Sequence, residues 1–208
     1  MKKLTIFAIC LTSYIMLNGL AFNIDFGFSQ FVGSDVDNTF QGKWGMGFGA
    51  SHSISIAKGF ALEPGGRILW LHDGYINKSP RINYNYALYY FEPFVKVRYR
   101  ANNVFMPTLY AGVGFPILGS ASIEADYKDD KDLNYKESVT QQFNTMNYSA
   151  LLGFEYLYEG MGLRFEYFRT LNTIKKETEA MNDVYLQSFF VSLVFTWDGI
   201  KEGASRGY

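Results

Sequence analysis

One stretch constrains the fold of this chain more than any other, because its side chains alternate between two kinds. In residues 43–56, KWGMGFGASHSISI, every second residue from Trp44 to Ile56 is apolar except His52. The residues between them are glycines and serines after Lys43. Successive side chains of a β-strand point to opposite faces, so this stretch predicts a strand with one bulky apolar face and one small polar face. Small residues coat a solvent-exposed sheet poorly, but they fit the crowded interior of a narrow barrel whose apolar face meets lipid.

The same alternation recurs about eight times. We expect strands at residues 22–31, 43–56, 60–71, 84–99, 104–117, around 152–156, around 163–167, and at 184–197. Polar loops at 32–42, 72–83, 118–144 and 172–183 alternate with short turns that follow each even-numbered strand. Outer-membrane barrels have short turns on one side and long loops on the other. The sequence therefore predicts an all-β fold, an eight-stranded antiparallel up-and-down transmembrane β-barrel.

The first 21 residues predict a cleavable signal peptide. Two lysines follow Met1, and an apolar run from Leu4 to Leu17 is too short to cross a bilayer as a helix. Small residues at Gly19 and Ala21 suit cleavage after position 21. We expect export by the Sec pathway, a barrel domain at 22–197 and a polar periplasmic tail at 198–208. The one cysteine lies within the expected signal peptide, so the exported chain would form no disulfide.

Composition narrows the class of protein further. Removal of Lys2 and Lys3 from the 19 basic residues leaves 17 against 20 acidic ones, so we do not expect nucleic acid as a partner. The chain contains 19 Phe, 16 Tyr and 3 Trp, yet its mean hydropathy is only −0.07. This combination is typical of a membrane barrel, because half of each strand is polar.

Two sets of site residues follow from the predicted strand phases. Isolated charges in a narrow lumen are costly, so inward acids and bases should pair and close the interior. The predicted lumen network contains Asp25, Lys43, Glu63, Arg67, Glu92, Lys96, Arg98, Glu155, Arg164 and Glu166. The predicted lipid-facing aromatic residues are Phe26, Phe28, Trp44, Phe48, Trp70, Phe91, Phe115, Phe154, Phe165, Phe189, Phe195 and Trp197.

Four segments carry a resemblance to a known family: ALEPGG at 61–66, FEPFVKVRY at 91–99, LGFEY at 152–156 and LRFEY at 163–167. On these residues the chain resembles the small bacterial outer-membrane β-barrel proteins, the OmpA/OmpX-like group of the outer membrane protein beta-barrel domain family. The resemblance implies a porin-like architecture in the outer membrane and contact with lipid and lipopolysaccharide. The chain departs from this family in one respect, because its last strand does not end at the C-terminus.

The predicted function is a structural or surface-interaction role with a closed lumen. Loops 118–144 and 172–183 are the candidate sites for an extracellular ligand or host partner. We expect a monomer with no cofactor, bound metal or catalytic residue. An alternative is a small passive diffusion channel, and the structural rival is a soluble lipocalin-like barrel.

An enzyme that modifies lipid is a further alternative. His52 lies between two serines on the apolar face, but Ile54 occupies the serine position of the His-x-Ser spacing. His72 and Asp73 resemble an acid–histidine dyad. Residues 126–134 match only the first three ligand positions of a calcium-binding EF-hand loop, since Tyr135 replaces the required glycine. We expect these residues to form a solvated acidic loop.

Overall fold

The computed structural model describes residues 19–34, 36, 40–78, 81–100, 107–128, 130–176 and 183–197. The first 18 residues of the expected signal peptide, the expected tail at 198–208, residues 104–106 of the fifth strand and part of the loop at 172–183 lie outside these residues. No helix in the described part of the chain is long and apolar enough to cross a membrane.

The described residues form strands joined by turns and two short 3₁₀ helices. The strands are β1 (Leu20–Val32), β2 (Phe40–His52), β3 (Ile54–Ala57), β4 (Phe60–Lys78), β5 (Arg81–Tyr99), β6 (Thr108–Gly114), β7 (Ile117–Tyr127), β8 (Tyr135–Ser138), β9 (Ser149–Tyr158), β10 (Met161–Thr170) and β11 (Tyr185–Thr196). The 3₁₀ helices are η1 (Lys131–Leu133) and η2 (Thr140–Gln142).

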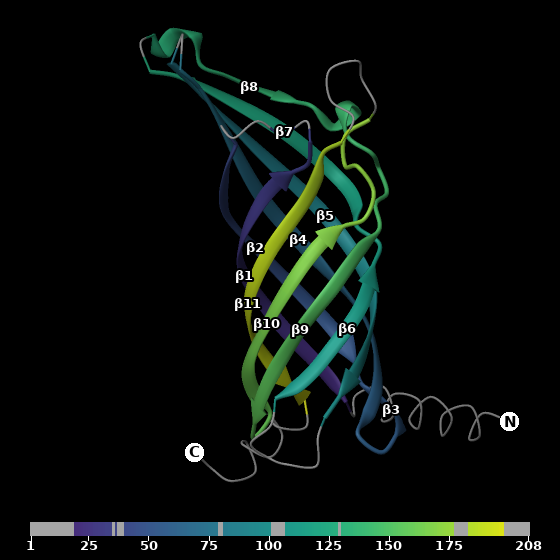
Figure 1. The fold of residues 1–208 in the computed structure, drawn as a ribbon. Helices are drawn as coiled ribbons and strands as arrows, with labels where there is room; N and C mark the ends of the chain where they lie inside the picture. The colour runs from purple at the N-terminus through teal and green to yellow at the C-terminus, as the bar shows by residue number, and fades with distance from the viewer. Residues whose placement is uncertain are drawn as a thin grey trace, which may run out of the picture.

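The strands close into a barrel with eight positions in its ring (Figure 1). β1 pairs antiparallel with β11 from Ala21 opposite Thr196 to Val32 opposite Tyr185, which joins the first strand to the last. β2 and β3 both pair with β4 and share one position, and β6 and β7 both pair with β5 and share another. Closure removes the free sheet edges that would otherwise expose unpaired backbone groups.

Two predicted strands are interrupted. The strand expected at 104–117 breaks at Phe115 and Pro116, because proline has no N–H to donate to a ladder. The strand expected at 43–56 breaks at Ser53, whose N–H donates to the carbonyl of Gly19 at 2.9 Å. Neither break opens the ring, since the pieces on each side keep the same partner strand.

The prediction of loops is wrong for two segments, because both contain paired strands. β4 and β5 pair without interruption from Phe60 opposite Tyr99 to Lys78 opposite Arg81, so residues 72–78 and 81–83 of the expected loop are strand. The expected loop at 118–144 contains β7, η1, β8 and η2. Polar composition misled the prediction, because the ladder is made by backbone groups that every non-proline residue has.

These extra strands build a sheet that continues the barrel wall outward, above the ends of β9, β10 and β11 (Figure 1). We call it the outer sheet and define it as residues 73–78, 81–88, 118–127 and 135–138. β7 pairs with β5 from Ile82 to Phe91, and β8 pairs with β7. The opposite end of the barrel holds the short turns, where Thr196 N–H donates to the carbonyl of Gly160 at 2.7 Å.

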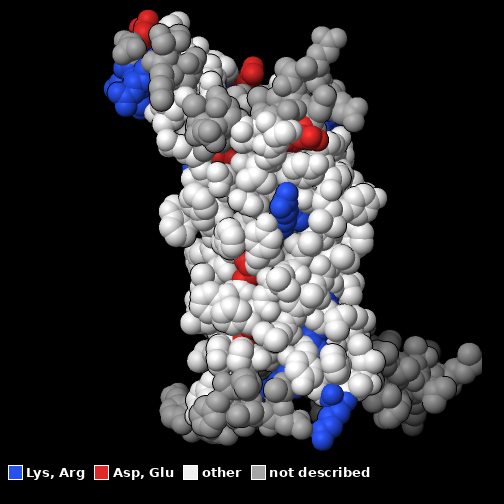
Figure 2. Space-filling model, in the orientation of Figure 1, with Lys and Arg blue, Asp and Glu red and all other residues white. Residues whose placement is uncertain are grey.

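Large apolar side chains cover the outer wall of the barrel, which is almost entirely white in Figure 2. Nine of the twelve aromatic residues predicted to face lipid are exposed, with Trp44 the most exposed of them at 76%. The other three, Phe115, Phe195 and Trp197, are only partly exposed. Phe115 packs edge-on against Tyr148 with ring centroids 5.9 Å apart.

Candidate functional site

Charged side chains fill the inner half of the lumen in two groups. The first surrounds Arg67, whose guanidinium lies 2.6 Å from Glu92, 2.5 Å from Glu166 and 3.6 Å from Asp25. Lys96 contacts the other oxygen of Glu166 at 2.5 Å. All five residues are buried, and they come from β1, β4, β5 and β10. Strands that lie far apart in sequence are thus tied together across the lumen.

In the second group two arginines bridge the same two carboxylates. Arg164 lies 2.9 Å from Glu63 and 2.7 Å from Glu155. Arg98 lies 3.0 Å from Glu63 and also pairs with Glu155. Two positive and two negative charges therefore meet in a compact arrangement. Such charges are tolerated away from water only when they are paired and hydrogen-bonded, as they are here.

Uncharged donors complete this network, and the sequence did not predict them as site residues. Asn23 donates to Asp25 at 2.6 Å, Ser51 to Glu63 at 2.9 Å and Ser149 to Glu92 at 2.6 Å. A carboxylate can accept about four hydrogen bonds, so these donors occupy positions that the bases leave open. The signal in the sequence was their inward phase, which Asn23 shares with Asp25 two residues later.

Lys43 does not join the lumen network that the sequence predicted for it. Its ammonium group instead bonds to the side-chain oxygen of Asn85 on β5. Lys43 keeps the inward phase, opposite the buried Ser29 on β1, but it lies four residues before Gly47, the residue opposite Asp25, and so nearer the loop end of the barrel than either group. The other nine charged residues predicted for the lumen all take part in the two groups.

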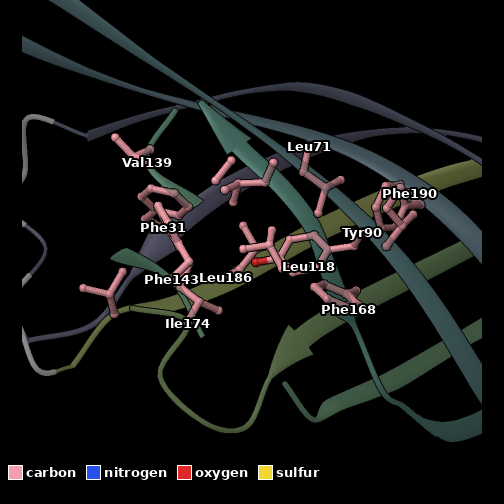
Figure 3. Packing of buried hydrophobic residues seen from close by; sticks show 14 of the residues in the cluster. Phe31, Leu71, Tyr90, Leu118, Val139, Phe143, Phe168, Ile174, Leu186 and Phe190 are labelled. Atoms are coloured by element: carbon pink, nitrogen blue, oxygen red, sulfur yellow. The ribbon is translucent and has the colours of Figure 1, made fainter. Parts of the chain in front are cut away.

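The outer half of the lumen is apolar, a feature that the sequence analysis missed. Buried side chains from β1, β4, β5, β7, β9, β10 and β11 point toward one another there, as Figure 3 shows. They include Leu69, Leu71, Leu88, Tyr90, Leu151, Phe168, Phe190, Phe31, Val139, Phe143, Ile174, Val184 and Leu186. We call this cluster the outer plug. Its members continue the inward phase of the strands beyond the charged residues, so the information was present in the alternation.

Loop residues seal the plug from outside. Phe143, which follows η2, is fully buried, and Asn144 N–H donates to the carbonyl of Ile174 at 2.8 Å. Lys175 lies over the rings of Tyr86 and Phe143, at 5.5 Å and 5.8 Å from their centroids. Burial lowers the pKa of Lys175. The mouth of the barrel is therefore filled by packed side chains of the 139–144 and 172–176 segments.

Asp73 lies at the rim of the barrel. It follows Trp70, the last of the large exposed apolar residues on the outer wall of β4. Its carboxylate accepts from the N–H of Phe31 at 2.5 Å and from its neighbour Gly74 at 2.6 Å. Burial nevertheless raises the pKa of Asp73 to about 7, because desolvation outweighs these two bonds. The carboxyl thereby holds the end of β1 against β4.

The catalytic pairs considered from sequence do not assemble around a nucleophile. His72 and Asp73 are neighbours on β4 and point to opposite faces, with the His72 ring 5.3 Å from that of Trp70. Ser51, next to His52, donates into the lumen to Glu63.

In the acidic stretch at 126–134, two of the candidate calcium ligands accept hydrogen bonds from backbone N–H groups of the same turn. Asn134 accepts from the N–H of Tyr127 at 2.7 Å, and Asp130 accepts from the N–H of Asp132 at 3.2 Å. Within the residues that the structure describes, no three His, Cys, Asp or Glu side chains are grouped so that they could hold a metal ion.

Comparison with known proteins gives no family model and no curated protein that matches this chain. Solved structures do match. Ail, the attachment invasion locus protein of Yersinia pestis, aligns with a TM-score of 0.50 at 9% identity over 86% of this chain and 98% of Ail. The fold is that of the small outer-membrane β-barrels. Neisserial surface protein A aligns with a TM-score of 0.48 at 11% identity, over 86% of this chain and 97% of that protein. OprG from Pseudomonas aeruginosa aligns at 0.35 and 12%, over 86% and 96%.

At these identities the similarity concerns the fold alone. The small-barrel architecture accounts for the ring of strands, the alternation of inward and outward residues and the long connections at one end.

Proposed function

We propose that the chain is an integral β-barrel of the bacterial outer membrane that conducts no solutes and acts through its outer surface. The apolar band on the outer wall supports the membrane location. On β4 it runs from Phe60 to Trp70, about 33 Å of strand at about 3.3 Å per residue. With the strand tilt of about 40° that is usual in such barrels, the band is about 25 Å tall, the usual apolar height of an outer-membrane barrel.

The observation that carries the non-conducting role is the double closure of the lumen. Ions that entered from the short-turn end would meet Arg98, Glu155 and Arg164, which are already paired with one another or with Glu63. Beyond them the side chains of the outer plug are mainly apolar and replace the hydration shell of an ion poorly. A passive channel would need both layers to move aside.

A surface role is supported by the tyrosines of the outer sheet. Tyr75 and Tyr84 stack with ring centroids 5.7 Å apart, and Tyr135 on β8 is 40% exposed. Tyrosine gives a binding surface a large, rigid contact area at low entropic cost and is enriched at protein interfaces. We therefore assign extracellular contacts to this sheet, to the rest of the 118–144 segment and to the loop at 172–183.

The membrane location and the closed lumen are tested together on the purified full chain. Cell fractionation should place it in the outer membrane, and its gel migration should change on heating. In planar bilayers it should give no stepwise conductance; discrete openings above those of protein-free bilayers would refute the closed lumen. We expect that overexpression of the chain leaves lipid A unchanged. A change in lipid A that His52→Ala abolishes would contradict this expectation and support a lipid-modifying enzyme.

The surface role needs its own comparison. Cells that display the barrel should bind host-cell or matrix-coated surfaces more strongly than cells without it, and Tyr135→Ser should weaken this binding. Tyr158→Ser is the matched control, since Tyr158 is 76% exposed at the short-turn end. Equal loss in the two variants would contradict a role for the outer sheet.

A further inference from the structure

The outer wall of the barrel carries a groove of about 740 Å³ that crosses β5, β6, β9, β10 and β11. It follows one row of paired outward residues. Phe189 is opposite Tyr167, Tyr167 is opposite Leu152, Leu152 is opposite Ala111, and Ala111 is opposite Val97. Ala111 is the smallest side chain in this row, and larger neighbours rise on both sides of it. The volume lies within the range of about 300–1,000 Å³ that is usual for ligand sites.

The groove runs obliquely across the wall, so its two ends lie at different heights along the barrel axis. Hydrogen-bonded rows run at right angles to strands, and the strands of such barrels tilt by about 35–45°, so a row descends as it passes around the barrel. Tyr167 lies near the outer end of β10, where the chain leads into the 171–176 segment. Tyr99, which also lines the groove, ends β5 beside the short turns. The groove therefore runs from the outer rim toward the inner end of the apolar band.

An arginine stands at the outer end of this groove. Arg169 is the next outward residue after Tyr167 on β10, it is exposed, and its guanidinium lies 5.8 Å from the ring centroid of Tyr185. Among the outward residues that the structure describes on β10 and β11 it is the one with a charge. Within the described residues no carboxylate lies within 4.0 Å of it, whereas the three lumen arginines are each paired.

We propose that this groove and Arg169 form a binding site for a phosphorylated lipid of the outer leaflet, with an acyl chain in the groove and a phosphate on the guanidinium. The inference rests on the proposed membrane location. Acyl chains are the surroundings of the apolar band, so they fill its depressions. Within the part of the chain that the structure describes, this guanidinium at the edge of the band has no carboxylate partner, and its fork of N–H donors matches a phosphate better than any neutral partner.

The site is tested by native mass spectrometry of the full chain in detergent micelles, titrated with diphosphoryl lipid A or with zwitterionic phosphatidylethanolamine. Lipid A should bind more tightly than phosphatidylethanolamine. Arg169→Gln should lower its affinity about fivefold, the effect of one basic residue near an anionic leaflet. Arg100→Gln removes an exposed arginine at the opposite end and should change the affinity less than twofold. Equal losses in the two variants would overturn the proposal.

A second pair of variants tests the groove itself. Ala111→Trp should fill it and lower lipid A affinity, whereas Ala50→Trp, at an outward position of β2, should leave affinity unchanged. Wild-type affinity in Ala111→Trp, or a dimer of the wild type that this substitution dissociates, would overturn the lipid site. Heat-modifiable migration verifies folding of each variant. Failure of lipid binding in a barrel that still fractionates with the outer membrane refutes this site alone, whereas a chain found outside that membrane refutes the proposed function.

Discussion

Glu166 bridges the two bases of the first lumen group, Arg67 and Lys96, and its substitution should cost the barrel a large part of its stability. It is 3% exposed and neutralises Arg67 and Lys96 at the same time. In Glu166→Gln, Arg67 keeps Glu92 and Asp25, but Lys96 loses its one ion pair among the described residues. The aromatic rings of Phe94 and Tyr110, 4.3 Å and 4.8 Å from the ammonium group, cannot replace a carboxylate.

An unpaired charge left inside a protein costs about 3–5 kcal/mol. We therefore expect Glu166→Gln to lower the free energy of unfolding by that amount. Removal of both charges in Glu166→Gln/Lys96→Met should restore most of it, because replacement of a whole buried pair is often close to neutral. The two sites touch, so their effects should be strongly non-additive.

Urea-induced unfolding in detergent micelles, followed by tryptophan fluorescence and by heat-modifiable migration, compares the single and the double variant with the wild type. Asp126→Asn is the control, since Asp126 forms an exposed pair with Lys128 at the tip of the outer sheet and should leave stability unchanged. Two results would refute this view of the lumen. The first is a free energy of unfolding for Glu166→Gln within about 1 kcal/mol of the wild-type value, since ordinary surface substitutions already change it by about 0.5 kcal/mol. The second is a double variant that is no more stable than the single one.

Three further substitutions test other parts of the structure. The pKa of Asp73 is raised from 3.8 to about 7 in the folded state, so the folded protein binds the carboxyl proton more tightly than the unfolded chain does. The free energy of unfolding should therefore fall as the pH rises from about 4 to 7, by at most about 4 kcal/mol. Asp73→Asn should flatten this part of the pH profile. Gly114→Ala should destabilise the barrel by about 1–3 kcal/mol in urea, since its Cβ would overlap Glu92, while Gly119→Ala, with only a backbone oxygen 3.6 Å away, should not. Phe143→Ala should cost about 3–5 kcal/mol in the outer plug and speed amide hydrogen exchange in the 139–144 segment, and unchanged exchange would contradict the plug.

Alternation was the most informative property of the sequence, and it was sufficient where both faces of a strand are constrained. A shift of one residue would turn Phe48 into the lumen and Gly47 out to the wall, so the register of β2 can be read without a structure. The same reasoning placed Arg67, Glu92 and Glu166 on one side of their strands. It could not say which acid meets which base, because the partners come from β4, β5 and β10 and meet only when the ring closes.

Strand ends were read less well than strand phases. Residues 72–78 look polar, yet they form a ladder with residues 81–87 of β5, and side-chain polarity does not oppose such pairing outside an apolar core. Lys43 has the predicted inward phase but lies nearer the loop end than the ion groups, and the level of a residue in the lumen depends on the stagger of the closed sheet.

By itself, then, the sequence determined which side chains point outward and which inward, since a period of two depends only on local backbone geometry. The tertiary structure decided how the inward residues share the lumen, with ion groups toward the short turns and the outer plug toward the loops. It also set Arg169 at the head of a groove, because neighbours across five strands are defined by the stagger of the closed sheet, which no single strand encodes.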